Sequence, residues 1–299
     1  MTRAEQRPQA EPQAPAGQDT PADPQALAER QTRAEPQALG EPQAQAEPQV
    51  PSGQDAPADP QALPKAEARA EPQPQPQALA ELEALADPAR AAEMAAYHKA
   101  PRRYLGVAVP EIQTLTARWR AGLDVSGRVA LAAGLWDSDV HEARIAAAKL
   151  LTQARIPEAE PLVWAETLRW VPAFDSWAIA DHACKAIERR LAADPSRLDT
   201  AETWAGDASM WVRRAALVAT LPWTRANHPD AREQAERDRI LGWAATLTGD
   251  RDWFIQKAIG WWLRTLSLHD ADRVRRFVAA EGAALKPFAR REALQRSQP

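Results

Sequence analysis

The sequence predicts an all-α domain that follows a long N-terminal tail without regular structure. From Pro76 onward, apolar residues recur at three- and four-residue spacing, as expected for helices with one buried face. Proline is frequent in residues 1–77, but in the second part it becomes sparse and marks helix starts instead. All 12 tryptophans lie in this second part, which is long enough to bury a sizeable core.

Residues 1–77 form the expected tail. They contain 15 of the 26 prolines, no tryptophan, and 12 acidic against 6 basic side chains, which gives a formal charge of about −6. The stretches AEPQAPAGQDTPADPQAL from Ala10 and AEPQVPSGQDAPADPQAL from Ala46 repeat with a period of 36 residues. A segment of this composition buries too little apolar surface to offset the entropy of ordering. We therefore expect a disordered linker without chemistry of its own.

Proline-containing dipeptides predict where helices begin in residues 78–299. They are Asp87-Pro88, Val109-Pro110, Ile156-Pro157, Asp194-Pro195 and His228-Pro229. Proline fits the first turn of a helix because its missing N–H would have no intrahelical acceptor there. With these starts, the second part accommodates about twelve helices of roughly 10 to 20 residues.

Four segments with similar sequences recur within the helical part. They are HEARIAAAKLL from His141, SWAIADHACKAIERRL from Ser176, MWVRRAALVATL from Met210 and WFIQKAIGWWLR from Trp253. Their starts are about 34 to 43 residues apart, which is the length of a two-helix HEAT-type unit. The spacing predicts a HEAT-like (ARM-repeat-type) α-solenoid of about six helix pairs. Each repeated segment would be the inner helix of its pair and would line a concave surface.

Basic side chains recur at matching positions of these inner helices. They are Lys149, Lys185, Arg213, Arg214, Lys257 and Arg264. On one concave wall they would form a basic groove suited to phosphates. The alternative is that they are ordinary solvated helix faces. Because residues 78–299 carry a formal charge of only about +2, a nucleic-acid surface would have to be a local patch.

The segment from Phe174 to Arg190 is expected to be one helix with an unusual polar face. Trp177, Asp181 and Lys185 follow one another at four-residue spacing and therefore share that face. Asp181 lies in an otherwise apolar stretch, and a carboxylate in that setting could stabilise a developing cation. The alternative is an ion pair between Asp181 and Lys185 on a solvated surface.

The last repeated segment contains tandem tryptophans. Lys257, Trp261 and Arg264 share one face of this helix, whereas Trp262 points elsewhere. Both indoles cannot enter the same core, so we expect one of them to line the groove. An indole face beside basic side chains suits a cationic or sugar-phosphate ligand. Trp211, at the start of the third segment, is expected in the core.

Several other chemistries lack a signal in the sequence. The single cysteine, Cys184, excludes an intramolecular disulfide and is expected to be a small buried residue. We expect neither a metal nor a cofactor, because the histidines show no ligand spacing and GxGxxG, P-loop and GxSxG motifs do not occur. The histidines are His98, His141, His182, His228 and His269. With no secretory signal and no run of about 20 apolar residues, a cytoplasmic protein is expected.

Four strings together resemble the AlkD-type DNA alkylation repair proteins. They are YLGVAVPEIQTL from Tyr104, SWAIAD from Ser176, WVRRAAL from Trp211 and WFIQKAIGWWLR from Trp253, in the order and approximate spacing of the family. The resemblance spans nearly all of residues 80–299. It implies a monofunctional DNA glycosylase of base-excision repair, a hydrolase that removes 3-methyladenine and 7-methylguanine from duplex DNA. We expect it to act as a monomer, without metal or cofactor.

The resemblance also implies roles for single residues. Trp177 and Asp181 match the family's tryptophan and catalytic aspartate, and Trp261 matches the tryptophan after the glycine of IQKAIGW. Arg214 matches a groove arginine, and Tyr97 matches a DNA-contacting tyrosine. Asp181 would stabilise the oxocarbenium-like sugar and direct a water, while the two indoles offer π-faces to the positive charge. The further expected DNA contacts are Lys185, Arg213, Lys257 and Arg264.

Two other functions are compatible with the same residues. Ala178 follows Trp177 where many relatives are expected to carry an acidic residue, and some related proteins bind DNA without excising a base. The chain could therefore be a non-catalytic HEAT-like protein that binds damaged or branched DNA. A protein-binding HEAT scaffold is the third possibility, and it requires the groove cations to be incidental.

Overall fold

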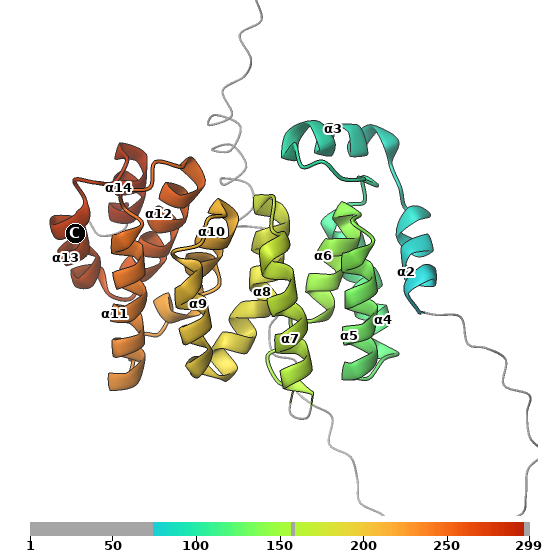
Figure 1. Ribbon diagram of the computed structural model, residues 1–299, viewed down its shortest axis with the longest axis horizontal. Coiled ribbons are helices and arrows are strands. Elements are labelled where there is room, and N and C mark those ends of the chain that lie inside the picture. Colours follow the sequence, from blue (N-terminus) through green and yellow to red (C-terminus); the bar gives the residue numbers. More distant parts are fainter. Residues whose placement is uncertain (1–73, 157–158, 296–299) are drawn as a thin grey trace, which may run out of the picture. The chain divides into compact units, whose positions relative to one another are not determined.

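The computed structural model describes residues 74–156 and 159–295, which fold into α-helices joined by short turns (Figure 1). No β-strand occurs within these two ranges, where the one β-type contact is an isolated bridge between Arg103 and Val140. The expected all-α fold is therefore confirmed.

The boundary of the expected tail differs by a few residues. Residues 1–73 lie outside the described part, whereas helix α2 already begins at Pro74, inside the expected tail of residues 1–77. Proline is compatible with a first helical turn, so the same residue type can belong to a linker or to a helix start. Ala78 and Leu82 bury α2 in the core.

The helices fall into two groups in chain order, first those before the gap at residues 157–158 and then those after it. The first comprises α2 (Pro74–Glu83), α3 (Pro88–His98), α4 (Val109–Ala121), α5 (Val125–Asp137) and α6 (His141–Leu150). The second comprises α7 (Glu160–Trp170), α8 (Trp177–Ala193), α9 (Leu198–Trp204), α10 (Met210–Val218), α11 (Ala231–Thr246), α12 (Trp253–Ser267), α13 (Ala271–Glu281) and α14 (Pro287–Leu294). Single 3-10 turns, at Val171–Ala173, Pro195–Arg197 and Leu221–Thr224, connect members of the second group.

Four of the five proline-marked starts lie at or near real helix starts. Asp87 caps α3, and its carboxylate accepts hydrogen bonds from the backbone N–H groups of Ala89 and Arg90 at 3.0 and 3.1 Å. The Val109 dipeptide begins α4, the Asp194 dipeptide begins the 3-10 turn before α9, and the His228 dipeptide lies just before α11. The fifth, Ile156-Pro157, falls partly on residues outside the described ranges.

The four repeated segments form the inner layer of the domain. They correspond to α6, α8, α10 and α12, and each of these helices packs on the next in that order. The helices between them in the sequence pack behind them, α5 on α6, α7 on α8 and α9 on α10. Figure 1 shows the inner helices following one another along the domain. The expected HEAT-like stack of helix pairs is confirmed.

Helix α8 begins three residues later than the sequence predicts. The expected start was Phe174, but Val171–Ala173 form a 3-10 turn and Phe174 itself is extended, with φ −70° and ψ 125°. Phe174 is buried against Trp136, with the ring centroids 6.3 Å apart. Packing of this aromatic ring fixes the turn, so Trp177 becomes the first residue of α8.

The tandem tryptophans differ in burial as expected, but Trp261 also packs against the core, and its expected place in a groove stays a prediction. Trp262 is fully buried, with 0% of its surface exposed, whereas Trp261 is only partly buried. Trp211 is also partly buried and packs against the core. Cys184 is buried among apolar side chains, which agrees with the expected structural role.

Candidate functional site

Asp181 forms a salt bridge with Arg214 of the neighbouring inner helix. The Arg214 Nη2 atom lies 2.8 Å from Oδ2 and 3.0 Å from Oδ1 of Asp181, and Nε lies 3.2 Å from Oδ1. The arginine side chain is 5% exposed, but the aspartate side chain keeps 23% of its surface exposed. The carboxylate is therefore fixed in orientation and still open to solvent on one side.

Arg214 is itself anchored on a third inner helix. Its Nη1 atom donates to the backbone carbonyl of Phe254 at 3.1 Å, and its guanidinium carbon lies 6.0 Å from the centroid of the Phe254 ring. This guanidinium thus joins α8, α10 and α12 at the position of Asp181. The N–H groups of Arg214, which the sequence predicts to contact DNA, are instead directed toward the interior of the domain.

Lys185 does not pair with Asp181. Its Nζ atom lies 3.3 Å from Oε2 of Glu188, one helical turn further along α8. The alternative reading of the sequence, in which Asp181 and Lys185 form a surface ion pair, is therefore wrong. Asp181 instead pairs with an arginine that is 33 positions away in the sequence, which only the packing of α8 against α10 brings close.

Aromatic rings surround Trp177 on one side. The Tyr97 ring meets the indole edge-on, with centroids 6.2 Å apart and planes at 90°, and the His98 ring lies 5.4 Å away at 47°. Trp177 is partly buried and lies one helical turn before Asp181. Trp177, Asp181 and Tyr97, to each of which the family resemblance assigns a role, therefore lie in one region of the domain.

A stack of rings next to Trp177 is not among the features that the sequence predicts. His98 stacks on His141 at 4.7 Å, and His141 stacks on Tyr104 at 4.7 Å. The Nδ1 atoms of both histidines are buried without a hydrogen-bond partner. These residues come from α3, from the loop after it and from α6, so no sequence spacing reveals them. Within residues 74–156 and 159–295, no group of three or more His, Cys, Asp or Glu side chains could hold a metal ion.

Burial keeps the imidazoles of this region uncharged near neutral pH. It lowers the pKa of His98 to about 4 and that of His141 to about 3. It also lowers the pKa of His182, the residue after Asp181, to about 3, and the nearby charges of Lys149 and Lys185 lower it further. Near neutral pH, the aromatic rings in this region therefore carry no charge.

The other expected DNA contacts each have a carboxylate partner. Arg213 pairs with Asp250 at 2.8 Å, whereas Lys257 and Arg264 both pair with Glu292 at 3.0 Å. All three remain partly exposed. A phosphate contact by any of them stays a prediction, and it would have to replace or share these partners.

Helix α14 supplies Glu292 because it lies very close to α12. A Cβ atom on Gly260 would be 3.2 Å from the backbone oxygen of Ala289 and 3.2 Å from Oε2 of Glu292. Glycine at this position therefore lets the two helices approach. Gly260 directly precedes Trp261 on α12, so this close contact lies next to that residue in the helix.

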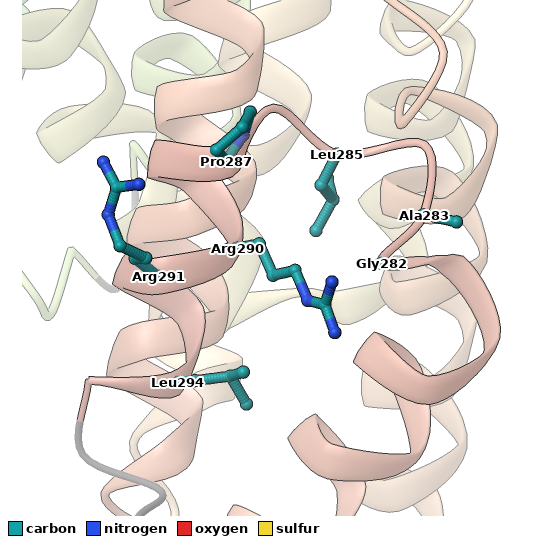
Figure 2. Close-up of a pocket in the computed structure, with 7 residues that line it drawn as sticks. All are labelled: Gly282, Ala283, Leu285, Pro287, Arg290, Arg291 and Leu294. Atoms are coloured by element: carbon teal, nitrogen blue, oxygen red, sulfur yellow. The ribbon is translucent and has the colours of Figure 1, made fainter.

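Two surface depressions lie away from the site residues. The larger, of about 480 Å³, lies between the end of α13 and α14, and Figure 2 shows Arg290 extending toward it while Arg291 points away. The smaller, of about 190 Å³, is lined mainly by α2 and α4. Neither is lined by Trp177, Asp181 or Trp261. No helix of the described residues is long and apolar enough to cross a membrane.

Comparison with known proteins identifies relatives of the helical part. Residues 78–296 match the model of a family described as DNA alkylation repair enzyme. A predicted DNA alkylation repair enzyme from Enterococcus faecalis has a similar structure, with 24% sequence identity, a TM-score of 0.57, and coverage of 70% of this chain and 95% of its own. No curated protein matches the chain.

Two further solved structures are less similar. AlkD2 from Streptococcus mutans shows 19% identity and a TM-score of 0.46, covering 63% of this chain and 89% of its own. The smu.31 protein from Streptococcus mutans UA159 shows 20% identity and a TM-score of 0.47, covering 62% and 90%.

Proposed function

The chain belongs to the DNA alkylation repair enzyme family, and we propose that it is a monofunctional glycosylase that releases cationic alkylpurines from duplex DNA. The substrates would include 3-methyladenine and 7-methylguanine, and the reaction would be hydrolysis of the N-glycosidic bond in base-excision repair. Membership of the family supports a role in alkylation repair with DNA as the partner. The glycosidic chemistry is proposed from the residues themselves.

The geometry of Asp181 is the observation that carries this proposal. Methylation gives the purine a positive charge, so the C1′–N bond can break with its electron pair leaving on the base. Positive charge then develops on the sugar, and a water oxygen adds to C1′ while its proton leaves to solvent. A carboxylate that is already oriented stabilises this charge without reorganising during the reaction. Asp181 is oriented by Arg214 and remains partly exposed.

Trp177 and Trp261 would act beside the carboxylate. An indole face attracts a cation through its quadrupole, so each ring can stabilise the positive sugar. Trp177 is held by Tyr97 and His98, and Trp261 sits half-buried on α12. Tyr97 would contact the DNA at the edge of this cluster.

Arg214 takes a different part in this proposal from the one that the sequence predicts. Its guanidinium is buried and its donors are bound within the chain, so we assign it the positioning of Asp181 rather than a phosphate contact. The partly exposed cations remain the proposed DNA contacts. They are Lys185, Arg213, Lys257 and Arg264.

A release assay tests the proposal. Duplex DNA methylated at purines is incubated with the protein, and free 3-methyladenine and 7-methylguanine are measured by chromatography. The proposal requires release well above spontaneous depurination, and it requires abasic sites to remain in an otherwise intact strand. Release that does not exceed the spontaneous rate at saturating protein would overturn it.

A non-catalytic protein that binds damaged or branched DNA is the second candidate. The salt bridge favours it in one respect, because Arg214 partly neutralises the charge that Asp181 would apply to the sugar. This candidate requires salt-sensitive duplex binding without base release. The same incubation therefore separates the two, provided that binding is measured in parallel.

A further inference from the structure

Arg102, in the loop after α3, is a buried cation that the proposed chemistry does not use. Its side chain is only 2% exposed, which leaves too little surface for a contact with DNA. The guanidinium donates a hydrogen bond to the carboxylate of Asp175, and its Nη1 atom lies 3.4 Å from the carboxylate of Asp139. Among residues 74–156 and 159–295, the bond to Asp175 is the only hydrogen bond of this side chain. Arg102 therefore joins the loops that precede α4, α6 and α8.

The two aspartates lie at matching places before rings of the candidate site. Asp139 precedes His141 by two residues, and Asp175 precedes Trp177, the first residue of α8, by two residues. Asp139 has a φ of 52°, in the left-handed region that residues other than glycine seldom adopt. Such a backbone conformation persists where neighbouring contacts hold it. Arg102 thus binds next to the first residues of both helices that carry these rings.

Trp177 relies on contacts from outside its own helix. The N-cap residue Ser176 is 1% exposed, and its hydroxyl has no hydrogen-bond partner among the described residues, so it does not cap α8. The rings against Trp177 are those of Tyr97 and His98, with centroids 6.2 and 5.4 Å away. Both belong to the end of α3, a fully described helix in which no residue is fully buried. Because α3 buries so little of its own surface, the loop that contains Arg102 has to keep its end in place.

We propose that Arg102 is a positioning residue, which holds the Trp177 ring beside Asp181 by tying the end of α3 to the start of α8. A charge-assisted hydrogen bond from a planar guanidinium fixes direction as well as distance. Trp177 lies one helical turn before Asp181, so a shift at the start of α8 moves the indole relative to the carboxylate. A misplacement of about 1 Å in a catalytic group can cost roughly a hundredfold in rate. The inference rests on the proposed function, because the indole affects a reaction only if bases are released there.

Fluorine NMR of protein labelled with fluorinated tryptophan tests the position of Trp177 independently of activity. The Trp177 resonance is assigned as the one that disappears in Trp177→Phe. Arg102→Met removes the charge and keeps an unbranched side chain. It leaves behind the carboxylates of Asp175 and Asp139, which are 38% and 53% exposed, so the domain should still fold. The Trp177 resonance should shift or broaden in Arg102→Met. Arg102→Lys should restore it in part, because lysine keeps the charge without the planar fork.

Arg144→Met is the matched control, because Arg144 shares Asp139 with Arg102. Its Nη2 atom lies 3.0 Å from that carboxylate, but its other contacts are with the backbone carbonyl and the ring of Trp136. Both variants therefore lose one positive charge and one partner of Asp139. Whatever its melting temperature, Arg144→Met should keep the parental Trp177 resonance and the parental rate of base release.

Single-turnover release of 7-methylguanine connects the position of the indole with the reaction. We expect Arg102→Met to be roughly ten- to a hundredfold slower than the parent, and no slower than Trp177→Ala, because it acts through that ring. In a Trp177→Ala background, Arg102→Met should cause no further loss. Affinity for undamaged duplex should stay parental, because the Arg102 side chain is buried.

The outcomes for Arg102 and for the glycosylase can be told apart. A parental Trp177 resonance in folded Arg102→Met would overturn the positioning role even when the parent releases methylated bases. A displaced resonance with a parental rate of release would overturn it as well, and so would an equal displacement in Arg144→Met. If the resonance moves only in Arg102→Met while the parent releases no base, the tie between Arg102 and Trp177 is supported and the proposed glycosylase fails.

Discussion

At the scale of single residues, the burial of Arg214 controls how Asp181 behaves. A buried guanidinium must keep an anionic partner, because leaving it unpaired costs about 3 kcal/mol or more. The pair therefore fixes the orientation of the Asp181 carboxylate, and removing either charge leaves the other without its partner. The sequence singles out both residues, Asp181 by its apolar surroundings and Arg214 by its position on a repeated helix, but their contact follows only from the packing of α8 on α10. For this reason a variant of Asp181 has to be compared with a variant of Arg214.

At the same scale, the buried histidine His141 makes the free energy of unfolding depend on pH in the acid range. Its pKa is lowered by burial, and then by the positive neighbours His98, Arg102 and His182, to about 3. In the unfolded chain the imidazole takes up a proton below about pH 6.5, whereas in the folded protein it stays neutral down to about pH 3. The free energy of unfolding therefore falls as the pH falls through this window, by up to about 1.4 kcal/mol per pH unit for this one group.

We expect His141→Phe to reduce the acid slope by the share of this one group, because phenylalanine keeps the stack but takes up no proton, whereas His98 and His182 still contribute theirs. Urea unfolding between pH 6.5 and 4 measures the slope. His228→Gln changes an exposed histidine and serves as the control. An acid slope in His141→Phe equal to that of the parent would show that His141 does not account for it.

At the scale of elements, α14 and α12 act as one unit. The close approach at Gly260 and the two salt bridges of Glu292 join them next to Trp261. Overpacking at a backbone contact costs about 1–3 kcal/mol, so Gly260→Val should destabilise the domain by that amount. Gly242 in α11 has no atom within 4 Å of a Cβ, and Gly242→Ala should be neutral or stabilise by up to about 1 kcal/mol. Thermal unfolding of both variants checks the contrast, and equal effects would contradict the close contact.

The elements themselves could largely be predicted from the sequence, whereas their contacts could not. The repeats that start at His141, Met210 and Trp253 coincide with the first residues of α6, α10 and α12, because periodicity and capping are local signals. Partners such as Glu292 for Lys257 lie 35 positions apart and have no local signature. The basic wall expected from matching positions is therefore mostly paired within the chain, and the histidine stack has no counterpart in any motif.

At the scale of the whole molecule, the helical part should fold and function without the N-terminal segment. Residues 1–77 have too little apolar content to contribute a core, yet α2 already begins at Pro74 and its Leu82 is buried. Deletion of residues 1–73 should therefore leave the melting temperature and base release unchanged. Deletion of residues 1–83, which removes α2, should lower the melting temperature, because it exposes the apolar surface that Ala78 and Leu82 cover. A large loss of stability in the shorter deletion would show that the segment packs on the domain.

The most direct test of the proposed function is single-turnover excision of 7-methylguanine by Asp181→Asn. Asparagine keeps the shape and removes the charge, so the rate should fall about a hundred- to a thousandfold, which corresponds to roughly 3 to 4 kcal/mol. DNA affinity should stay the same or rise slightly, because a negative charge near the phosphates is removed. Arg214→Gln should give a smaller loss, and assays run well below the melting temperature of each variant exclude unfolding as the cause. A folded Asp181→Asn variant that excises at the parental rate would contradict the proposal and leave Asp181 as the structural partner of Arg214.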